Sequence, residues 1–159
     1  MFEVVLFEPE IPPNTGNIIR LCAATGARLH LIEPLGFELD DRRLRRAGLD
    51  YHEFAAVEVH ASLATFAARC RPQRLFAQSR FATHSLYEVR FSPGDALLFG
   101  AESRGLPPDL DERIAVTSRV RIPMREGIRS LNLANAVAIT VYEALRQCNA
   151  MTPDGLQLP

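Results

Sequence analysis

The chain has 159 residues, of which 47% are hydrophobic and 23% charged, and this composition excludes a disordered chain, a fibre and a small disulfide scaffold. All 18 basic residues are arginine, which excludes lysine chemistry such as a Schiff base or a P-loop lysine. The formal net charge of −1 excludes a uniformly basic nucleic-acid binder, although it leaves room for a local basic patch.

The first half of the chain alternates short apolar runs with helical patterns. Phe2–Phe7 predicts a buried strand, and Thr15–Thr25 predicts a helix that Asn14 caps and Gly26 ends. The later elements expected here are a strand at Arg28–Ile32, a charged helical turn at Asp40–Ala47, a strand at Phe54–Val59 and a helix at Ser62–Arg69.

The second half continues this alternation and ends in the longest helix. The expected elements are strands at Arg74–Gln78, Ala96–Phe99 and Val120–Pro123 and helices at Pro107–Ile114 and Ser130–Gln147, the last capped by Ser130. Strand–helix alternation predicts an α/β fold with a mainly parallel sheet covered by helices on both faces. We assign a single domain to residues 1–149 and expect residues 150–159 to form a poorly ordered tail.

The last helix carries apolar residues on more than one side, which predicts burial inside the domain or against a second subunit. Its periodicity leaves both arrangements open.

Cysteines, histidines and the N-terminus indicate a soluble, cytoplasmic protein. Cys22, Cys70 and Cys148 are odd in number and far apart, so we interpret them as small hydrophobic side chains in a reducing compartment. The four histidines lack the spacing of a metal motif, so no metal site is expected. The N-terminus lacks a cleavable signal, and no apolar run approaches the ~18 residues of a membrane span.

Two polar segments follow predicted strands, where open α/β sheets bind their ligands. In PPNTGNIIR, residues 12–20, Arg20 lies far enough into the helix to reach back over the loop. In LLFGAESRGLPP, residues 97–108, Gly100 allows a backbone to approach a ligand closely. An ordinary capped helix with a solvated arginine, and a plain strand-to-helix turn, remain the structural alternatives.

The third segment is RIPMREGIRSLNLAN, residues 121–135. Asn132 and Asn135 share one face near the start of the last helix, where side-chain amides need buried partners or a ligand. The chain contains neither G-x-G-x-x-G nor G-x-x-x-x-G-K-[ST], which excludes the conventional dinucleotide and P-loop sites.

Together the three segments resemble the SPOUT superfamily of RNA methyltransferases. The motifs P-x-N-x-G-N-I-x-R, F-G-x-E-x-x-G-L-P and R-I-P-M followed by R-S-L-N-L-A-N-A-V occur in the family's order, and the resemblance covers roughly residues 2–147. EPEIPPNTGNIIRLCAATG and DDRRLRRAGLDYHEF are further similar to the single-domain tRNA (cytidine/uridine-2′-O-)-methyltransferases that modify the wobble nucleotide.

The resemblance implies an α/β knot fold with a C-terminal trefoil knot, a homodimer with sites near the subunit interface, and S-adenosyl-L-methionine as cofactor. The residues that would bind the cofactor come from three loops and are Gln78, Ser79, Gly100, Glu102, Ile122, Met124, Ser130 and Leu131.

The resemblance also assigns roles to arginines. Arg20 matches the arginine that activates the ribose 2′-hydroxyl in relatives; because guanidinium stays protonated, we expect it to stabilise the developing alkoxide or a neighbouring phosphate, with Asn14 positioning it. Glu102 is expected to touch the cofactor, to orient Arg20 or to anchor its loop. The arginines expected to bind the tRNA anticodon stem-loop are Arg42, Arg43, Arg45, Arg46 and Arg104, with Arg129 as a further candidate. A salt-bridged helical turn is the alternative for the first four.

The function that the resemblance implies is S-adenosylmethionine-dependent methylation of the 2′-hydroxyl of the wobble cytidine or modified uridine. Two alternatives stay open: a related 2′-O-methyltransferase acting on another tRNA or rRNA position, and a catalytically silent RNA-binding module. The short chain, without an appended RNA-binding domain, weighs against the first. The intact set of Asn14, Arg20, Glu102 and Ser130–Asn132 weighs against the second.

Overall fold

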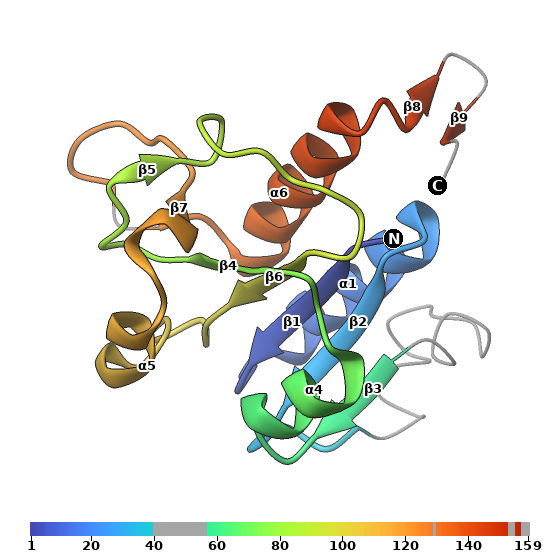
Figure 1. Cartoon of the computed structure of the whole chain (residues 1–159). Helices are drawn as coiled ribbons and strands as arrows, with labels where there is room; N and C mark the ends of the chain where they lie inside the picture. The colour runs from blue at the N-terminus through green and yellow to red at the C-terminus, as the bar shows by residue number, and fades with distance from the viewer. Residues whose placement is uncertain (40–56, 129, 153–154, 157–159) are drawn as a thin grey trace.

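A parallel sheet forms the centre of the computed structural model, which describes residues 1–39, 57–128, 130–152 and 155–156. Its strands are β1 (Glu3–Phe7), β2 (Arg28–Ile32), β3 (Val57–His60), β4 (Leu75–Gln78), β5 (His84–Ser85), β6 (Ala96–Phe99) and β7 (Arg119–Arg121). They lie in the order β3-β2-β1-β6-β4-β7-β5, and each neighbouring pair is parallel (Figure 1). The predicted mainly parallel α/β sheet is confirmed.

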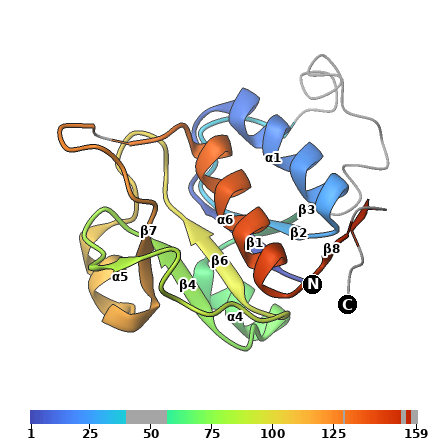
Figure 2. The ribbon, with the colours of Figure 1, turned by 90° about the horizontal axis from the view of Figure 1, so that it is seen from above.

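Helices cover both faces of this sheet. They are α1 (Pro12–Thr25), α4 (Leu63–Cys70), α5 (Pro108–Arg113), the short 3-10 helix η1 (Val116–Ser118) and α6 (Leu133–Gln147). Figure 2 shows α1 and α6 side by side over one face and α4 on the opposite side, where it packs on β2 and β3. Right-handed crossovers between parallel strands place helices in this way.

The central strands feed two apolar cores because their side chains alternate between the faces. Val4 and Leu6 of β1 join the larger cluster, which also contains Val141 of α6. Val5 points to the other face and packs in the cluster with Phe66 of α4. All five side chains are fully buried, and each such burial stabilises the fold by about 1.5–3 kcal/mol.

Helix α1 begins earlier than the sequence predicts. Its first residue is Pro12 rather than Thr15, because a proline fits the first turn, where backbone N–H groups have no intrahelical acceptor. The N-cap is Ile11, so the prediction that Asn14 caps this helix is wrong. Asn14 lies inside the first turn, and its side chain is used elsewhere. The predicted end at Thr25, with Gly26 in the left-handed conformation, is confirmed.

Helix α6 begins later than predicted, and Ser130 does not cap it. The cap is Asn132, whose side-chain oxygen accepts from the backbone N–H of Ala134 at 2.9 Å and of Asn135 at 3.4 Å. Asn132 thus takes the role expected of Ser130, and helix α6 starts at Leu133.

The last two strands at one edge of the sheet, β7 and β5, are short. Strand β7 ends at Arg121 instead of Pro123, since a proline has no N–H for the ladder. The pair His84–Ser85 was not expected, because two residues are too few to show a period. The expected turn at Asp40–Ala47 lies outside the described residues, as does the first part of the strand expected at Phe54–Val59.

The segment after Asn149 contains local structure where a frayed tail was expected. Strands β8 (Met151–Thr152) and β9 (Gly155–Leu156) pair antiparallel, and Ala150 is buried next to the end of α6. Ala150 and Leu156 both pack against the larger core.

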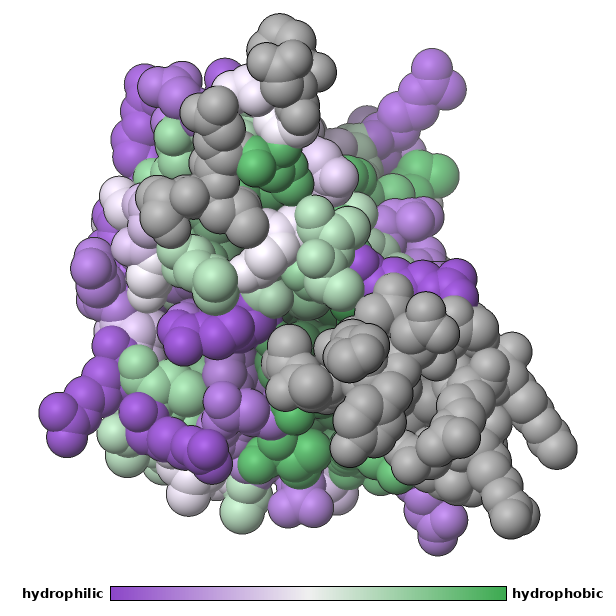
Figure 3. Space-filling model, turned by 90° about the vertical axis from the view of Figure 1, so that its right-hand side faces the viewer, coloured by the Kyte–Doolittle hydropathy of each residue, from purple (hydrophilic) through white to green (hydrophobic). Residues whose placement is uncertain are grey.

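The cysteines are free thiols, as the sequence predicts for small apolar side chains. Cys22 is buried in the larger core, and burial raises the pKa of its thiol to about 12. On the face shown in Figure 3, hydrophilic side chains project around the margin and apolar surface lies between them. Within the described ranges, none of the helices combines the length and the apolar character that crossing a membrane requires.

Candidate functional site

Loops at the carboxyl ends of β4, β6 and β7 surround an open cleft of about 1010 Å³. Carboxyl ends of parallel strands share one edge of a sheet, so loops far apart in sequence meet there. The cleft is lined by all eight residues expected to bind a cofactor, namely Gln78, Ser79, Gly100, Glu102, Ile122, Met124, Ser130 and Leu131. Asn14 and Arg104 also line it.

The loop after β6 is closed so tightly that it requires a glycine. A Cβ atom on Gly100 would lie 2.1 Å from the carbonyl carbon of Gly105 and 2.2 Å from the backbone nitrogen of Leu106. Ala101 and Gly105 form an isolated bridge, with the N–H of Gly105 donating to the oxygen of Ala101 at 2.8 Å. Gly100 therefore fixes the shape of this wall of the cleft.

Glu102 fastens the same loop to the start of α1. Its carboxylate accepts from the backbone N–H of Glu10 at 2.7 Å, from that of Ile11 at 3.2 Å and from Asn14 Nδ2 at 3.0 Å. A carboxylate near a helix N-terminus is also favoured by the helix dipole. Of the three expected roles, this geometry supports the loop anchor.

A second contact is made in the opposite direction, from Glu10 to the loop. The Glu10 carboxylate accepts from the N–H and the hydroxyl of Ser103, both at 2.9 Å, and these hydrogen bonds lower the pKa of Glu10. Arg104, the next residue, pairs with Glu8. The segments around residues 8–11 and 102–104 are thus tied by reciprocal contacts.

Asn14 links these two segments to the start of α6. Its side chain is buried; Nδ2 donates to Glu102, while Oδ1 accepts from Asn132 Nδ2 at 2.9 Å. Glu102, Asn14 and Asn132 therefore form one hydrogen-bonded chain across the three segments singled out by the sequence. Asn132 was predicted to need a polar partner, and that partner is Asn14. The signal in the sequence was a side-chain amide at the start of an otherwise apolar helix.

The last residue of β4 leaves an acceptor unused. Gln78 Oε1 is buried and has no hydrogen-bond partner among the described residues. Leaving a buried acceptor unpaired costs about 1–3 kcal/mol, which a donor on a bound ligand would recover. The neighbouring Ser79 is committed to its own loop: its N–H donates to Val120, and its hydroxyl accepts from the N–H of Phe81 at 3.1 Å.

Apolar side chains line the cleft on the side of β7. Ile122 is buried, whereas Met124 and Leu131 are exposed by 44% and 37%. Exposed apolar side chains facing a cleft offer a surface for a flat, apolar ring. The cleft therefore combines an unpaired acceptor with an apolar wall, which suits a ligand that has both polar donors and an aromatic part.

Residues 1–142 match the model of the SpoU rRNA methylase family. The chain belongs to this family. The resemblance to RNA methyltransferases predicted from the three segments is thereby confirmed.

Three relatives of this SpoU family chain illustrate the similarity. A tRNA (cytidine(34)-2′-O)-methyltransferase from Polaromonas sp. (strain JS666 / ATCC BAA-500) is 59% identical over 149 residues, covering 92% of this chain and 91% of that protein. A solved structure concerned with the 2-OH methylation of C/U34 on tRNA has 48% identity and a TM-score of 0.85, covering 95% of this chain and 98% of its own. An AdoMet-bound rRNA methyltransferase from Sinorhizobium meliloti has 29% identity and a TM-score of 0.77, covering 91% of this chain and 56% of its own.

The expected catalytic arginine is not among the described residues that line the cleft. Arg20 is exposed on α1 and is absent from the described residues that line the cleft, whereas Asn14, one turn and a half earlier, lines it. Arg42, Arg43, Arg45, Arg46 and Arg129 lie outside the described residues.

Three further arginines at the cleft were not predicted from the sequence. Arg80, Arg121 and Arg125 line it and are exposed. The guanidinium of Arg80 lies 4.6 Å from the ring centroid of Phe81, which is itself 59% exposed. These arginines are scattered along the chain, so no local run of charge announces them.

Proposed function

We propose that this chain is an S-adenosylmethionine-dependent tRNA methyltransferase that methylates the ribose 2′-hydroxyl of the wobble nucleotide, a cytidine or a modified uridine, in the anticodon loop. The observation that carries the proposal is the convergence of all eight expected cofactor residues on one cleft. The 59% identity to a tRNA (cytidine(34)-2′-O)-methyltransferase, over nearly the whole of both chains, supports the choice of substrate.

The cleft residues suit the proposed cofactor. Gln78 Oε1 would accept from a donor of the cofactor, and Ile122, Met124 and Leu131 would pack against the adenine. Ser130 lines the cleft, and its hydroxyl would hydrogen-bond the cofactor, while Gly100 fixes the shape of the facing loop. When bound, S-adenosylmethionine supplies a methyl group already activated on a sulfonium, so the protein's main task is alignment.

The hydrogen-bonded chain of Glu102, Asn14 and Asn132 holds the walls of the cleft at fixed positions. Its side-chain groups are directed at one another and at backbone N–H groups, so we assign these residues to positioning. The role expected of Asn14 is to position Arg20, and we propose that it does so by fixing the start of α1, the helix that carries Arg20.

Arg20 is proposed to stabilise the alkoxide that develops on the ribose, or the phosphate next to it. A guanidinium stays protonated in proteins and therefore cannot act as a general base, but it can stabilise negative charge through two parallel hydrogen bonds. Removing one such electrostatic contact from an active site typically costs about 10²–10³ in kcat.

The proposal includes a homodimer whose sites lie near the subunit interface, because Arg20 does not line the cleft of its own chain within the described residues. Helix α6 retains partly exposed apolar side chains, among them Ile139 and the 41% exposed Tyr142, which would suit a subunit contact. We also propose a C-terminal trefoil knot, since threading would hold the loop before α6 against the other two loops of the cleft.

The tRNA anticodon stem-loop is the proposed partner, and the cytoplasm is the proposed location. Arg104, which pairs with Glu8, lies at the cleft with Arg80 and Arg121, and these guanidinium groups would contact phosphates and stack on unpaired bases. Arg42, Arg43, Arg45 and Arg46 are proposed to extend this basic surface.

Methyl transfer to unmodified tRNA tests the function. Purified protein is incubated with S-adenosylmethionine carrying a labelled methyl group and with either unmodified tRNA or ribosomal RNA, and the labelled nucleotide is mapped. We expect one 2′-O-methyl group at nucleotide 34 of tRNA. Label at another tRNA position or in ribosomal RNA would instead establish a different target, and no transfer despite RNA binding would indicate a silent binding module.

A further inference from the structure

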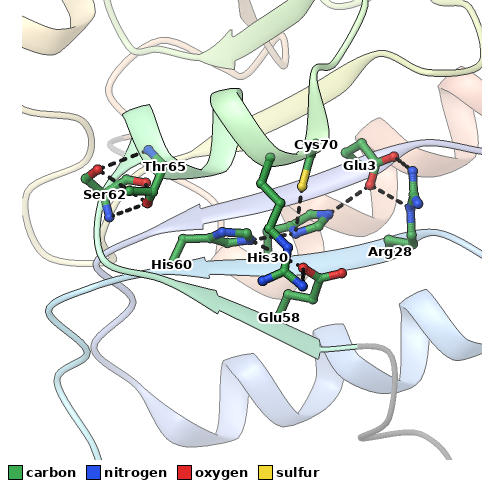
Figure 4. Close-up of polar contacts among 9 residues, drawn as sticks. Glu3, Arg28, His30, Glu58, His60, Ser62, Thr65 and Cys70 are labelled. Carbon is green, nitrogen blue, oxygen red and sulfur yellow. Dashed lines mark hydrogen bonds and ion pairs between the residues drawn. The ribbon is translucent and has the colours of Figure 1, made fainter.

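Four potential metal ligands meet away from the cleft, on the face of the sheet covered by α4 (Figure 4). They are His30 of β2, Glu58 and His60 of β3, and Cys70 at the end of α4, here called the His–Cys cluster. One ligand atom from each residue lies within 4.8 Å of all the others. His30 and His60 are buried, while Glu58 and Cys70 are half-buried and give access from solvent.

Strand register brings the cluster together. His30 is paired with Glu58, and Ile32 with His60, in the parallel ladder of β2 and β3. Side chains two residues apart on a strand point to the same face, so Glu58 and His60 both point toward α4. Cys70 then reaches them from the last turn of that helix, with Sγ 3.9 Å from His30 Nδ1.

The orientation of His30 directs a lone pair at the cluster. Its Nε2 lies 2.8 Å from Glu3 Oε2, and because a carboxylate only accepts, Nε2 carries the proton. In the neutral imidazole the lone pair is then on Nδ1, which lies 3.0 Å from His60 Nε2. A carboxylate that orients an imidazole through its other nitrogen is the usual second layer around metal-binding histidines.

Glu58 adds a fourth potential ligand, a carboxylate oxygen that makes an ion pair but no hydrogen bond within the described residues. Its Oε2 is buried without a hydrogen-bond partner among the described residues and lies 4.0 Å from His60 Nε2. The same Oε2 is in an ion pair with Arg69, whose Nη2 lies 3.3 Å away, so a bound ion would share this oxygen with the guanidinium. One carboxylate oxygen of Glu58 lies within 4.8 Å of the ligand atoms of the other three residues.

We propose that His30, Glu58, His60 and Cys70 form a binding site for Zn²⁺. Two imidazoles, a thiolate and a carboxylate are borderline-to-soft ligands, which favour zinc over Mg²⁺ or Ca²⁺. Tetrahedral Zn²⁺ would place two nitrogens about 3.3 Å apart and a nitrogen and a sulfur about 3.6 Å apart. The separations of 3.0 Å and 3.9 Å at His30 Nδ1 require only small movements to match.

Four protein ligands leave no open position on the ion, so the site is structural and joins β2, β3 and α4. Phe66 shields it on one side, with its ring centroid 4.8 Å from that of His30 and 5.5 Å from that of His60. On binding, the S–H bond of Cys70 breaks and its proton goes to solvent. His60 exchanges the proton on Nε2 for one on Nδ1, so both imidazoles remain neutral.

Zinc binding is measured on the full chain after treatment with a chelator, by titration with ZnCl₂ in competition with a chromophoric zinc chelator. We expect one Zn²⁺ per chain. Glu3→Gln, which removes the carboxylate behind His30, lowers the affinity about 10–100-fold. Cys70→Ser and His60→Gln lower it further, because each removes a ligand. The matched controls Cys148→Ser and His84→Gln, half-buried residues outside the cluster, leave the affinity unchanged.

Cobalt provides a readout that does not depend on stability. Co²⁺ bound in place of Zn²⁺ should give the intense visible absorption of a tetrahedral site and a thiolate charge-transfer band that Cys148→Ser retains and Cys70→Ser loses. Far-ultraviolet circular dichroism checks that each variant is folded. The proposal is overturned if the wild type binds no Zn²⁺. It is also overturned if Cys70→Ser and His60→Gln bind Zn²⁺ as tightly as the wild type does. Either result leaves His30 and His60 as a hydrogen-bonded pair in the core.

Discussion

The cleft and the His–Cys cluster both gather polar side chains on the same sheet. They differ in how the hydrogen-bonding groups of those side chains are paired. In the cleft, Glu102 and Asn14 hold the walls together, while Gln78, a lining residue, has a buried Oε1 without a hydrogen-bond partner among the described residues. In the cluster, His30 and His60 are buried against Phe66 and bonded to each other. An open site with unused acceptors suits ligand exchange, whereas a closed set of ligands suits one permanently held ion.

The strongest test of the cleft is the substitution Gly100→Ala. The added Cβ would lie about 2.1 Å from the backbone of Gly105, a clash that the loop can relieve only by opening. We expect a loss of S-adenosylmethionine binding and a decrease in the free energy of unfolding of about 3 kcal/mol. Isothermal titration with the cofactor and thermal unfolding measure the two effects.

Gly105→Ala is the matched control for that substitution. Gly105 has a φ of +72°, but a Cβ there meets nothing within 4 Å. The expected cost is therefore the strain of a left-handed residue alone, about 1–2 kcal/mol, with most of the cofactor affinity retained. Equal loss of affinity in both variants would show that the closeness of Gly100 to Gly105 is unimportant.

Arg20→Ala separates catalysis from cofactor binding. Because Arg20 is absent from the described lining of the cleft, we expect cofactor affinity to stay within several-fold, while methyl transfer falls by about 10²–10³ or more. Single-turnover methylation and cofactor titration are measured in parallel, with Arg113→Ala, an exposed arginine of α5, as control. Retained turnover in Arg20→Ala would remove this residue from the mechanism.

Glu102→Gln tests the link between the cleft and α1. Glutamine keeps the shape but presents an N–H₂ group to donors that need an acceptor, so we expect a loss of about 1–3 kcal/mol in the free energy of unfolding. The change should also slow methylation without altering zinc affinity, since the His–Cys cluster is separate. Glu112→Gln, an exposed carboxylate of α5, is the control.

A double-mutant cycle completes this test. If Glu102, Asn14 and Asn132 act as one chain, the effects of Glu102→Gln and Asn132→Ala on stability will be non-additive by at least about 0.5 kcal/mol. Simple additivity would mean that the two hydrogen bonds to Asn14 are independent.

The same comparison explains which features the sequence could predict. The resemblance to the family predicted that Gln78, Gly100 and Ser130 belong to one site, and all three line the cleft. The alternation of strands and helices alone would not have selected Gln78, which lies outside the three motifs. The helix starts could not be fixed, because Asn14 and Ser130 have the chemistry of N-caps while tertiary partners and prolines decide which residue acts as one.

The His–Cys cluster was outside the reach of sequence spacing. His30 and His60 are 30 residues apart, and only the register between β2 and β3 puts them in contact. The prediction that no metal site exists considered histidines near one another in sequence. A parallel ladder instead joins residues from separate strand–helix units, and no local motif encodes its register.

The smallest expected effect on stability comes from the ion pair of Glu143 and Arg146 on α6, which belongs to neither the cleft nor the His–Cys cluster. Hydrogen bonds from Arg146, at 2.8 Å, lower the pKa of Glu143, although burial of the carboxyl opposes them. A carboxyl whose pKa is lower in the folded state than in the unfolded state stabilises the fold above the unfolded value, and this stabilisation is lost as the pH falls through the folded value. Wild-type stability should therefore decline below a pH of about 4.5 more steeply than that of Glu143→Gln. Urea unfolding across this range, at constant ionic strength, measures the difference. An identical decline in both proteins would mean that the Glu143–Arg146 pair does not contribute to stability. If Glu143→Gln changes the free energy of unfolding less than Glu102→Gln does, the carboxylate at the cleft stabilises the fold more than an ordinary helix ion pair.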